Sequence, residues 1–208
     1  MKVITTYLQM IARPERVVPP PRDGLAVAHA RKPTVAAYGQ SEEHGNEPAR
    51  EDYPMNHDAL IEQYLAGPGL LRRAVAGMTR DQRLARPIPG KWSTQEVVCH
   101  LADYEPIYAD RMKRVIALEG PELLRGDPGL FAARLAYDQR DVDEELALIE
   151  ITRKQMARIL RALKPEDFKR QGGHSRDGAL TLENLLQRVT AHIPHHVRFI
   201  EEKRRALW

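Results

Sequence analysis

Four long amphipathic segments constrain the fold of this chain more than any other feature. From residue 56 onward, apolar residues recur every three or four positions, which is the period of an α-helix, and no alternating strand pattern competes with it. We expect these helices over residues 60–78, 93–118, 142–163 and 181–205. The pattern therefore predicts an all-α fold in which four helices form a bundle.

The segments between the helices carry clear turn and capping signals. The Gly-Pro-Gly sequence at 67–69 should kink or break the first helix, because proline removes a backbone donor. Ser93 and Glu96 have the spacing of a capping box at the start of the second helix. Residues 119–140 form a long crossover between the second and third helices, so the topology need not be plain up-down-up-down. Residues 171–179 are expected to be a loop.

The first 55 residues differ from the rest of the chain. They hold seven of its 15 prolines and show no sustained apolar period. We therefore expect two parts, a poorly ordered Pro-rich extension over 1–55 and the bundle domain over 56–208. Met55 is also a plausible alternative start, and the hypothesis that the preceding segment is a start-site artefact can be tested by the intact mass of the natively expressed protein.

Composition excludes several classes of protein. The 32 basic and 29 acidic residues nearly cancel, which argues against a nucleic-acid partner. No apolar run reaches the length of about 20 residues that spans a bilayer, and no signal peptide is recognisable, so we expect a cytoplasmic location and no membrane partner. Cys99 is the single cysteine, which excludes an intrachain disulfide. We expect it to be a small buried apolar residue rather than a nucleophile.

Three of the eight histidines have the placement of metal ligands. His192 and His196 are one helical turn apart on the same face, and His100 comes from another helix with its neighbours facing inward. Three neutral imidazoles leave a coordination position open, as catalytic metal sites do, although satisfied core or surface histidines are the alternative. Asp103 and His174 are candidates for catalytic residues that orient the incoming group.

Several stretches together resemble the DinB-like superfamily. They are Met78 to Gln82, Gly90 to Ser93 followed by Val97 to Asp103, Phe168 to Arg170 with His174, Thr181 to Leu186, and the closing His192-x-x-His195-His196. The resemblance covers about residues 56–206 in the right order. It is nearest to the branch of bacillithiol transferases, which has also been described as metal-dependent hydrolases.

The resemblance implies a DinB-type four-helix bundle, often a homodimer, with a divalent metal ion held by three histidines. The family ligands fall on His100, His192 and His196, the residues that helical spacing also selects. Zn²⁺ is the default ion, and Ni²⁺, Fe²⁺ and Mn²⁺ remain open. One departure is Pro194, which lies between two of the expected ligands and should kink or bulge the helix there.

The function implied is that of a metal-dependent enzyme acting on small molecules. It would be a thiol S-transferase of bacillithiol type, using a low-molecular-weight thiol as cosubstrate, or a hydrolase. The alternative is a non-catalytic bundle that binds metal or serves as a stress-related dimeric protein. A helical regulator that binds DNA is disfavoured by the balanced charge.

Overall fold

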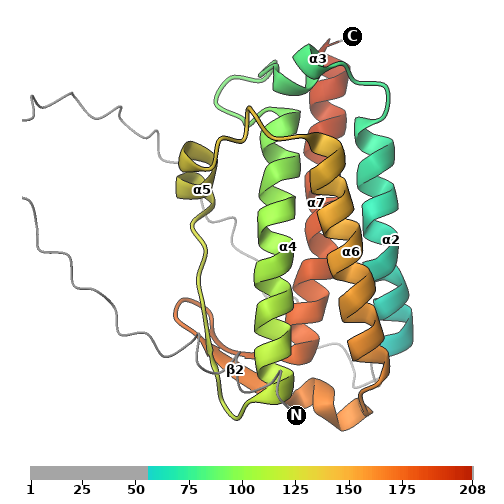
Figure 1. The fold of residues 1–208 in the computed structure, drawn as a ribbon, viewed down its shortest axis with the longest axis vertical. Coiled ribbons are helices and arrows are strands. Elements are labelled where there is room, and N and C mark those ends of the chain that lie inside the picture. Colours follow the sequence, from blue (N-terminus) through green and yellow to red (C-terminus); the bar gives the residue numbers. More distant parts are fainter. Residues whose placement is uncertain (1–55, 208) are drawn as a thin grey trace, which may run out of the picture. The chain divides into compact units, whose positions relative to one another are not determined.

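The computed structural model describes residues 56–207, whose main part is a bundle of four long helices (Figure 1). These are α2 (His57–Val75), α4 (Thr94–Ala117), α6 (Val142–Arg161) and α7 (Leu182–Leu207). The connections contain α3 (Arg80–Leu84), β1 (Glu122–Leu123), α5 (Pro128–Arg134), the 3-10 helix η1 (Pro165–Lys169), β2 (Gln171–His174) and β3 (Gly178–Thr181). The predicted four-helix bundle is confirmed, and each long helix ends within about one turn of its predicted limits.

Each long helix packs against two of the other three. α2 and α4 both contact α6 and α7, so α2 lies diagonally opposite α4, and α6 lies opposite α7. The space between them is filled by fully buried apolar side chains, among them Leu71, Leu101, Met112, Ile149 and Leu185. Burial of each such side chain contributes about 1.5–3 kcal/mol, so the apolar faces detected in the sequence supply most of the drive for folding.

The long crossover after α4 sets the direction of the chain through the bundle. In Figure 1, α4 and α6 run in the same direction, so the chain that leaves the end of α4 returns along the bundle before α6 begins. The amide of Gln95, in the first turn of α4, donates to the carbonyl of Arg140, just before α6, at 2.6 Å. Parallel neighbouring helices cannot be joined by a short turn, which is why this connection is long.

The start of α4 has the capping box that its sequence predicts. The Oγ of Ser93 accepts a hydrogen bond from the Glu96 N–H at 3.1 Å, and the Glu96 carboxylate accepts one from the Ser93 N–H at 2.8 Å. The Asp141 carboxylate similarly accepts from two N–H groups in the first turn of α6. Such caps satisfy amides that lack a partner within the helix, and so they define where each helix begins.

A small three-stranded sheet closes one end of the bundle, where a loop was expected over residues 171–179. β2 pairs with β1 in parallel and with β3 in antiparallel orientation. Gly172 is required where β2 meets the chain before β1, because a Cβ there would lie 2.8 Å from the carbonyl oxygen of Pro121. Strands of two to four residues, one of them with two glycines, are too short to show an alternating pattern.

One buried arginine contacts all four long helices. Arg153 of α6 donates through Nε and Nη2 to the carboxylate of Glu105 on α4, at 3.0 and 2.9 Å, and both side chains are 0% exposed. Its Nη1 donates to the carbonyl of Tyr64 on α2 at 2.7 Å, and its Nη2 donates to that of Val189 on α7 at 2.9 Å. The guanidinium therefore ties the bundle together at its centre.

The Gly-Pro-Gly sequence of α2 makes room for this arginine and bonds it. The predicted break of the helix at this sequence is wrong. Because Pro68 has no N–H, the carbonyl of Tyr64 lacks its partner within the helix. Nη1 of Arg153 supplies the missing donor. A Cβ on Gly67 would lie 2.2 Å from the same Nη1, so only glycine leaves room for it. α2 consequently continues unbroken from His57 to Val75.

Replacing the two glycines beside Pro68 by alanine should change the stability of the protein in opposite directions. Gly67→Ala should lower the free energy of unfolding by about 1–3 kcal/mol, because three partners hold the guanidinium where the new methyl group would lie. Gly69→Ala is the matched control, since its Cβ would meet only the end of the exposed Arg73 side chain, at 3.5 Å. It should raise stability by up to about 1 kcal/mol. Urea unfolding followed by circular dichroism measures both, and equal stability of the two variants would contradict this packing.

The Pro-rich extension predicted over residues 1–55 lies outside the described residues, as does the proposed alternative start at Met55.

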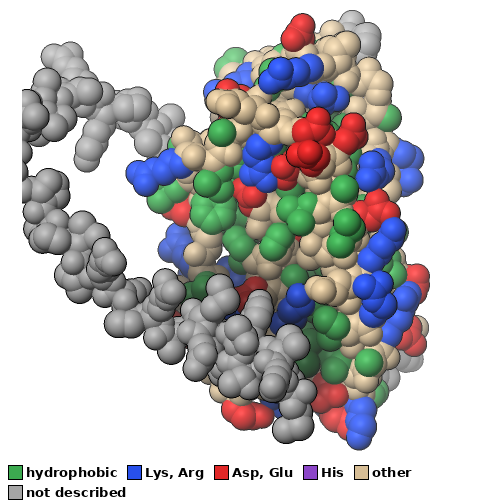
Figure 2. All heavy atoms as spheres, viewed as in Figure 1, with side chains coloured by type: hydrophobic (Ala, Val, Ile, Leu, Met, Phe, Trp, Pro, Cys, Tyr) green, Lys and Arg blue, Asp and Glu red, His purple; other side chains and the backbone are tan. Residues whose placement is uncertain are grey.

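Between residues 56 and 207, none of the helices combines the length and the apolar character that a membrane span requires. On the face drawn in Figure 2, basic and acidic side chains are interspersed among apolar ones. The described part of that face therefore presents mixed charge rather than a continuous basic surface.

Candidate metal centre

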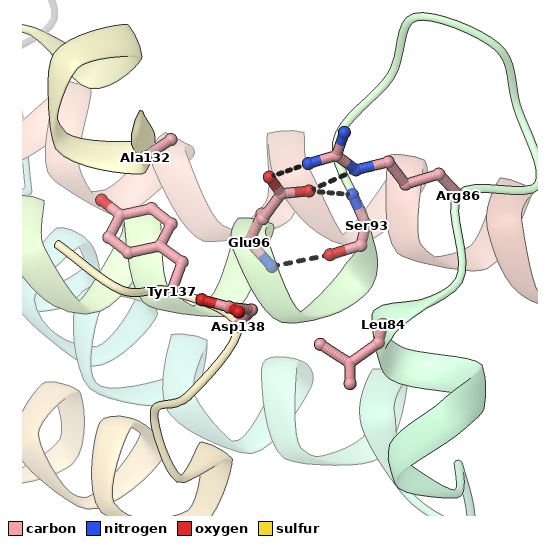
Figure 3. Close-up of a pocket in the computed structure, with 7 residues that line it drawn as sticks. All are labelled: Leu84, Arg86, Ser93, Glu96, Ala132, Tyr137 and Asp138. Carbon is pink, nitrogen blue, oxygen red and sulfur yellow. Dashed lines mark hydrogen bonds and ion pairs between the residues drawn. The ribbon is translucent and has the colours of Figure 1, made fainter. Parts of the chain in front are cut away.

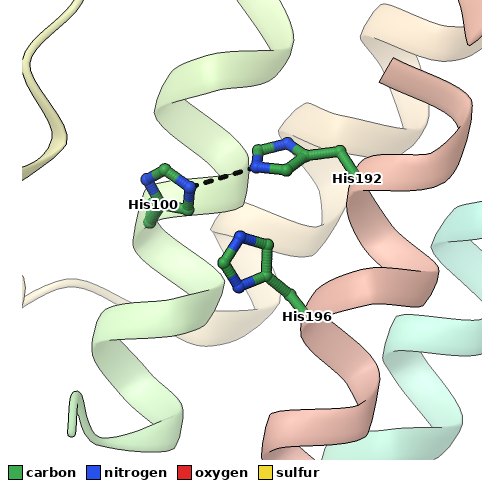
Figure 4. A group of neighbouring side chains, drawn as sticks. All are labelled: His100, His192 and His196. Carbon is green, nitrogen blue, oxygen red and sulfur yellow. Dashed lines mark hydrogen bonds between the residues drawn. The ribbon is translucent and has the colours of Figure 1, made fainter. Parts of the chain in front are cut away.

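Three histidines from two facing helices point toward one another (Figure 4). His100 lies in the second turn of α4, and His192 and His196 are one turn apart on α7. The fully buried Ile193 and Ile200 hold α7 against the core. His192 and His196 therefore lie at the edge of the apolar stripe and are only partly buried, whereas His100 is buried.

The distances between the three side chains suit a shared ion. The Nε2 atoms of His100 and His192 lie 3.1 Å apart, and one candidate ligand atom from each of the three side chains lies within 4.8 Å of the others. A tetrahedral ion bound at 2.0–2.1 Å requires ligand nitrogens about 3.3 Å apart. No other group of three potential ligands within residues 56–207 meets the same distance criterion.

Aromatic packing and one hydrogen bond, between His100 and His192, orient the three rings. Their Nδ1 atoms are buried, and none has a hydrogen-bond partner in the described part of the chain. The ring of His100 instead lies 5.2 Å from that of Trp92 and 4.6 Å from that of Tyr104, while Phe199 lies 6.0 Å from His196. The nitrogens that converge are thus the Nε2 atoms on the inner side, which fits a set of three nitrogen donors for one ion.

Burial keeps all three imidazoles neutral at physiological pH. It lowers the pKa of His100 to about 4, against a weaker opposing effect of Asp103. Burial, followed by the nearby histidines, lowers the pKa of His196 to about 3 and that of His192 well below its usual range. A neutral imidazole has the free lone pair that coordination requires, so these side chains are ready to bind a cation near pH 7.

Pro194 does not separate the two histidines of α7. The helix is continuous from Leu182 to Leu207, and the rings of His192 and His196 lie 4.8 Å apart. Proline at this position leaves the carbonyl of Thr190 without its helical donor. The missing backbone hydrogen bond therefore costs free energy beside the site, but the two imidazoles stay on one face of α7.

Asp103 has partners other than the histidines. Its carboxylate accepts a hydrogen bond from the hydroxyl of Tyr137 at 2.7 Å and pairs with Arg140 at 2.9 Å. Arg140 also pairs with Glu145 at the start of α6. These contacts hold the end of the crossover against α4, one turn beyond His100. The predicted role of Asp103 in orienting the incoming group stays a prediction.

His174 lies on β2, away from the three converging imidazoles. It is 8% exposed, and its Nδ1 accepts a hydrogen bond from the backbone N–H of Asp177 at 3.2 Å. Burial lowers the pKa of His174, and the positive charge of Arg111 acts in the same direction. The neutral ring is thus held by the hairpin, and a role toward the incoming group stays a prediction.

Two tyrosines of α4 that were not predicted as site residues border the three histidines. The ring of Tyr104 lies 4.6 Å from His100 and 6.0 Å from His192, and that of Tyr108 lies 6.3 Å from His192. Burial raises the pKa of Tyr104 to about 12, so its hydroxyl stays protonated. The signal was present in the spacing, because residues 100, 104 and 108 follow one another at intervals of four.

A cavity of about 260 Å³ lies beside the start of α4, one turn before His100 (Figure 3). The carboxylate of Glu96, which borders it, is already bound by Arg86 at 2.5 Å and by the backbone of Ser93 at 2.8 Å. The complete lining is Leu84, Arg86, Ser93, Glu96, Ala132, Tyr137 and Asp138. It contains none of the three histidines, and Glu96 and Arg86 serve there to cap and brace α4.

Cys99 faces the crossover rather than the histidines. It is fully buried, and its Sγ lies 3.5 Å from the carbonyl oxygen of Tyr137. Burial raises the pKa of the thiol to about 12, although Arg140 opposes the shift. The thiolate, which is the reactive form, is therefore scarce at neutral pH, in agreement with the structural role expected from the sequence.

Cys99 should consequently be inert in the folded protein. At pH 8, reaction with a chromogenic disulfide reagent should be at least about a hundredfold slower for the native chain than for the chain in urea, because both exposure and thiolate fraction increase on unfolding. Absorbance after mixing measures the two rates. Rapid labelling of the native protein would show that the thiol is accessible and would return Cys99 to the list of candidate nucleophiles.

The bundle and its three gathered histidines define a class of protein that comparison with known families identifies. The model of the DinB superfamily matches residues 63–200, so the chain belongs to this superfamily. The resemblance and the fold expected from the sequence are both confirmed.

Particular relatives share both the sequence and the fold. The chain is 32% identical over 144 residues to "Putative metal-dependent hydrolase YfiT" of Bacillus subtilis, covering 68% of this chain and 80% of YfiT. A protein of Oceanobacillus iheyensis with the same functional name is 28% identical over 133 residues, covering 64% of this chain and 77% of that protein. The solved structure of YfiT, titled a probable metal-dependent hydrolase with an unusual four-helix bundle topology, matches with a TM-score of 0.71 at 29% identity, covering 79% of this chain and 96% of that chain.

Proposed function

We propose that this chain is a metal-dependent enzyme that activates a small nucleophile, water or a thiol, for attack on a small molecule. The observation that carries the proposal is the convergence of three neutral imidazoles, from His100, His192 and His196, at the partly open edge of the bundle. The names of its relatives support a hydrolase. Thiol transfer rests on the resemblance of the sequence motifs to the bacillithiol-transferase branch.

The three histidines would hold the ion, with Zn²⁺ as the default and Ni²⁺, Fe²⁺ or Mn²⁺ as alternatives. A divalent ion in such a site supplies Lewis acidity, which lowers the pKa of a coordinated water or thiol so that a nucleophile exists at neutral pH. Three protein ligands leave a position for that group, whereas structural zinc sites use four.

The aromatic side chains around the histidines hold the imidazole rings in place. Trp92 and Tyr104 pack against His100 and fix the angle of its ring. Phe199 does the same for His196. Because these contacts are apolar, they also keep water away from the inner side of the site, which strengthens electrostatic interactions there. The homodimer, the small-molecule substrate and the cytoplasmic location remain predictions.

Replacing any of the three histidines should abolish tight binding of the ion. Protein purified without an affinity tag should contain one divalent ion per chain by mass spectrometry. His100→Ala, His192→Ala and His196→Ala should each lower metal affinity by at least about a hundredfold, since loss even of a supporting residue can cost as much. His195→Ala is the matched control, because its exposed side chain bonds Arg198 on the other side of α7. Full metal content in His100→Ala would contradict the assignment.

The type of reaction can be separated by two assays on the same metal-loaded sample. Conjugation of a monohalobimane to a panel of low-molecular-weight thiols reports transfer, and release of nitrophenol from a nitrophenyl ester without thiol reports hydrolysis. We expect turnover in one of them that is lost with a chelator, restored by Zn²⁺, and absent in His192→Ala. One ion per chain without turnover in either assay would favour the non-catalytic metal-binding bundle and contradict the proposed enzyme.

A further inference from the structure

A second polar feature lies on the same helix as His100. Arg111 of α4 is only 6% exposed, yet within residues 56–207 it pairs with no carboxylate. Its Nε and Nη2 both donate to the carbonyl of Leu124, at 3.0 and 2.6 Å. Its Nη1 has no hydrogen-bond partner in the described chain and is not among the fully buried polar atoms. A largely buried guanidinium without a counter-ion is unfavourable unless an anion reaches it.

Arg111 is connected to the histidines along one face of α4. It continues the spacing of His100, Tyr104 and Tyr108, and side chains on a helix lean toward its N-terminus, which here means toward His100. The guanidinium carbon lies 5.2 Å from the centre of the Tyr108 ring, and that ring lies 6.3 Å from the ring of His192. Tyr108 therefore neighbours both groups, and the two distances place the guanidinium carbon no more than about 11.5 Å from the centre of the His192 ring.

Two other arginines, Arg188 and Arg125, act electrostatically on the same histidine, His174, as Arg111 does. Arg188 lies one turn before His192 on the facing helix α7 and is held by Asp177 at 2.5 Å, with its side chain 45% exposed. After the effect of burial, Arg111, Arg188 and Arg125 all lower the pKa of His174, against the single opposing effect of Asp177. Of these three arginines, only Arg188 forms an ion pair within residues 56–207, with Asp177, although Asp127 acts on Tyr104 together with Arg111 and Arg125.

We propose that Arg111, with Arg188 at the rim, binds a carboxylate of the small molecule whose reacting group lies at the three histidines. Arg111 accounts for the affinity, because its guanidinium offers a planar donor edge that matches a carboxylate and is already fixed by Leu124. Tyr104 and Tyr108 form an aromatic wall between the two ends. The inference deepens the proposed function, since it assigns the substrate or the thiol cosubstrate to the class of carboxylates.

The subsite can be tested without any metal. Succinate and its neutral analogue succinamide are titrated into chelator-treated full-length protein, and heat or tryptophan fluorescence reports binding. Succinate should bind at least about tenfold more tightly than succinamide, because charge-assisted hydrogen bonds exceed neutral ones. Equal affinity for the two compounds would overturn the proposal, whatever the histidines bind.

Variants then locate the contact. Arg111→Met should weaken succinate binding by at least about tenfold and Arg111→Lys by less, because lysine restores the charge without the planar edge. Lys113→Met removes the same charge from the exposed opposite side of α4, where Lys113 bonds Gln155 of α6, and should bind succinate like wild type. Equal affinity of Arg111→Met and wild type would overturn the proposal, as would equal weakening in Lys113→Met.

Two further measurements keep the result decisive. If Arg111→Met does not fold, Arg188→Met is tested in its place, because the Arg188 side chain is exposed. Succinate should then bind about threefold more weakly, as expected for a charge at the rim. Unchanged succinate affinity would overturn the proposal. On Zn²⁺-loaded protein, mercaptosuccinate should bind more tightly than 2-mercaptoethanol, and Arg111→Met should remove the difference while retaining full metal content. Metal loss in the histidine variants tests the proposed function separately, so the two ideas can fail independently.

Discussion

The bundle depends on the ion pair between Arg153 and Glu105 at its centre. Removing two charges from water costs several kcal/mol per ion, and the cost is offset only where the geometry satisfies every donor. Here the carboxylate takes two hydrogen bonds, and the carbonyls of Tyr64 and Val189 take the others. Since Arg153 and these three partners come from four different helices, the pair acts as a constraint on their relative positions, and the apolar faces alone would tolerate more than one arrangement.

The same ion pair fixes the level along the bundle at which His100 meets His192 and His196. Glu105 lies five residues after His100 on α4, and Val189 lies three residues before His192 on α7. By binding both, Arg153 fixes the register between the two helices that supply the imidazoles. A slide of one turn, about 5.4 Å, would separate His100 from the other two histidines. The rigid core therefore positions a site that lies at its edge.

The facing sides of α4 and α7 bring together three kinds of side chain. Apolar and aromatic side chains surround the histidines and keep them neutral, so that they are available as ligands. Farther along α4, two tyrosines lead to Arg111, whose charge has no acid to pair with in the described chain. In the proposed function, the histidines would hold an ion and Arg111 would bind a carboxylate of the same small molecule.

The sequence alone determined the four helices, the capped start of α4 and the three histidines, because each depends on spacing within a single helix or on a local motif. It also favoured Cys99 as a buried residue. The tertiary structure decided what no local pattern contains: that Gly67 and Pro68 receive Arg153 instead of breaking α2, that Asp103 is bound by Tyr137 and Arg140, and that residues 171–181 form a hairpin. In the first two cases the physical reason is that a polar group was satisfied by a partner far away in the chain. The hairpin instead pairs nearby residues, and its strands are too short to show an alternating pattern.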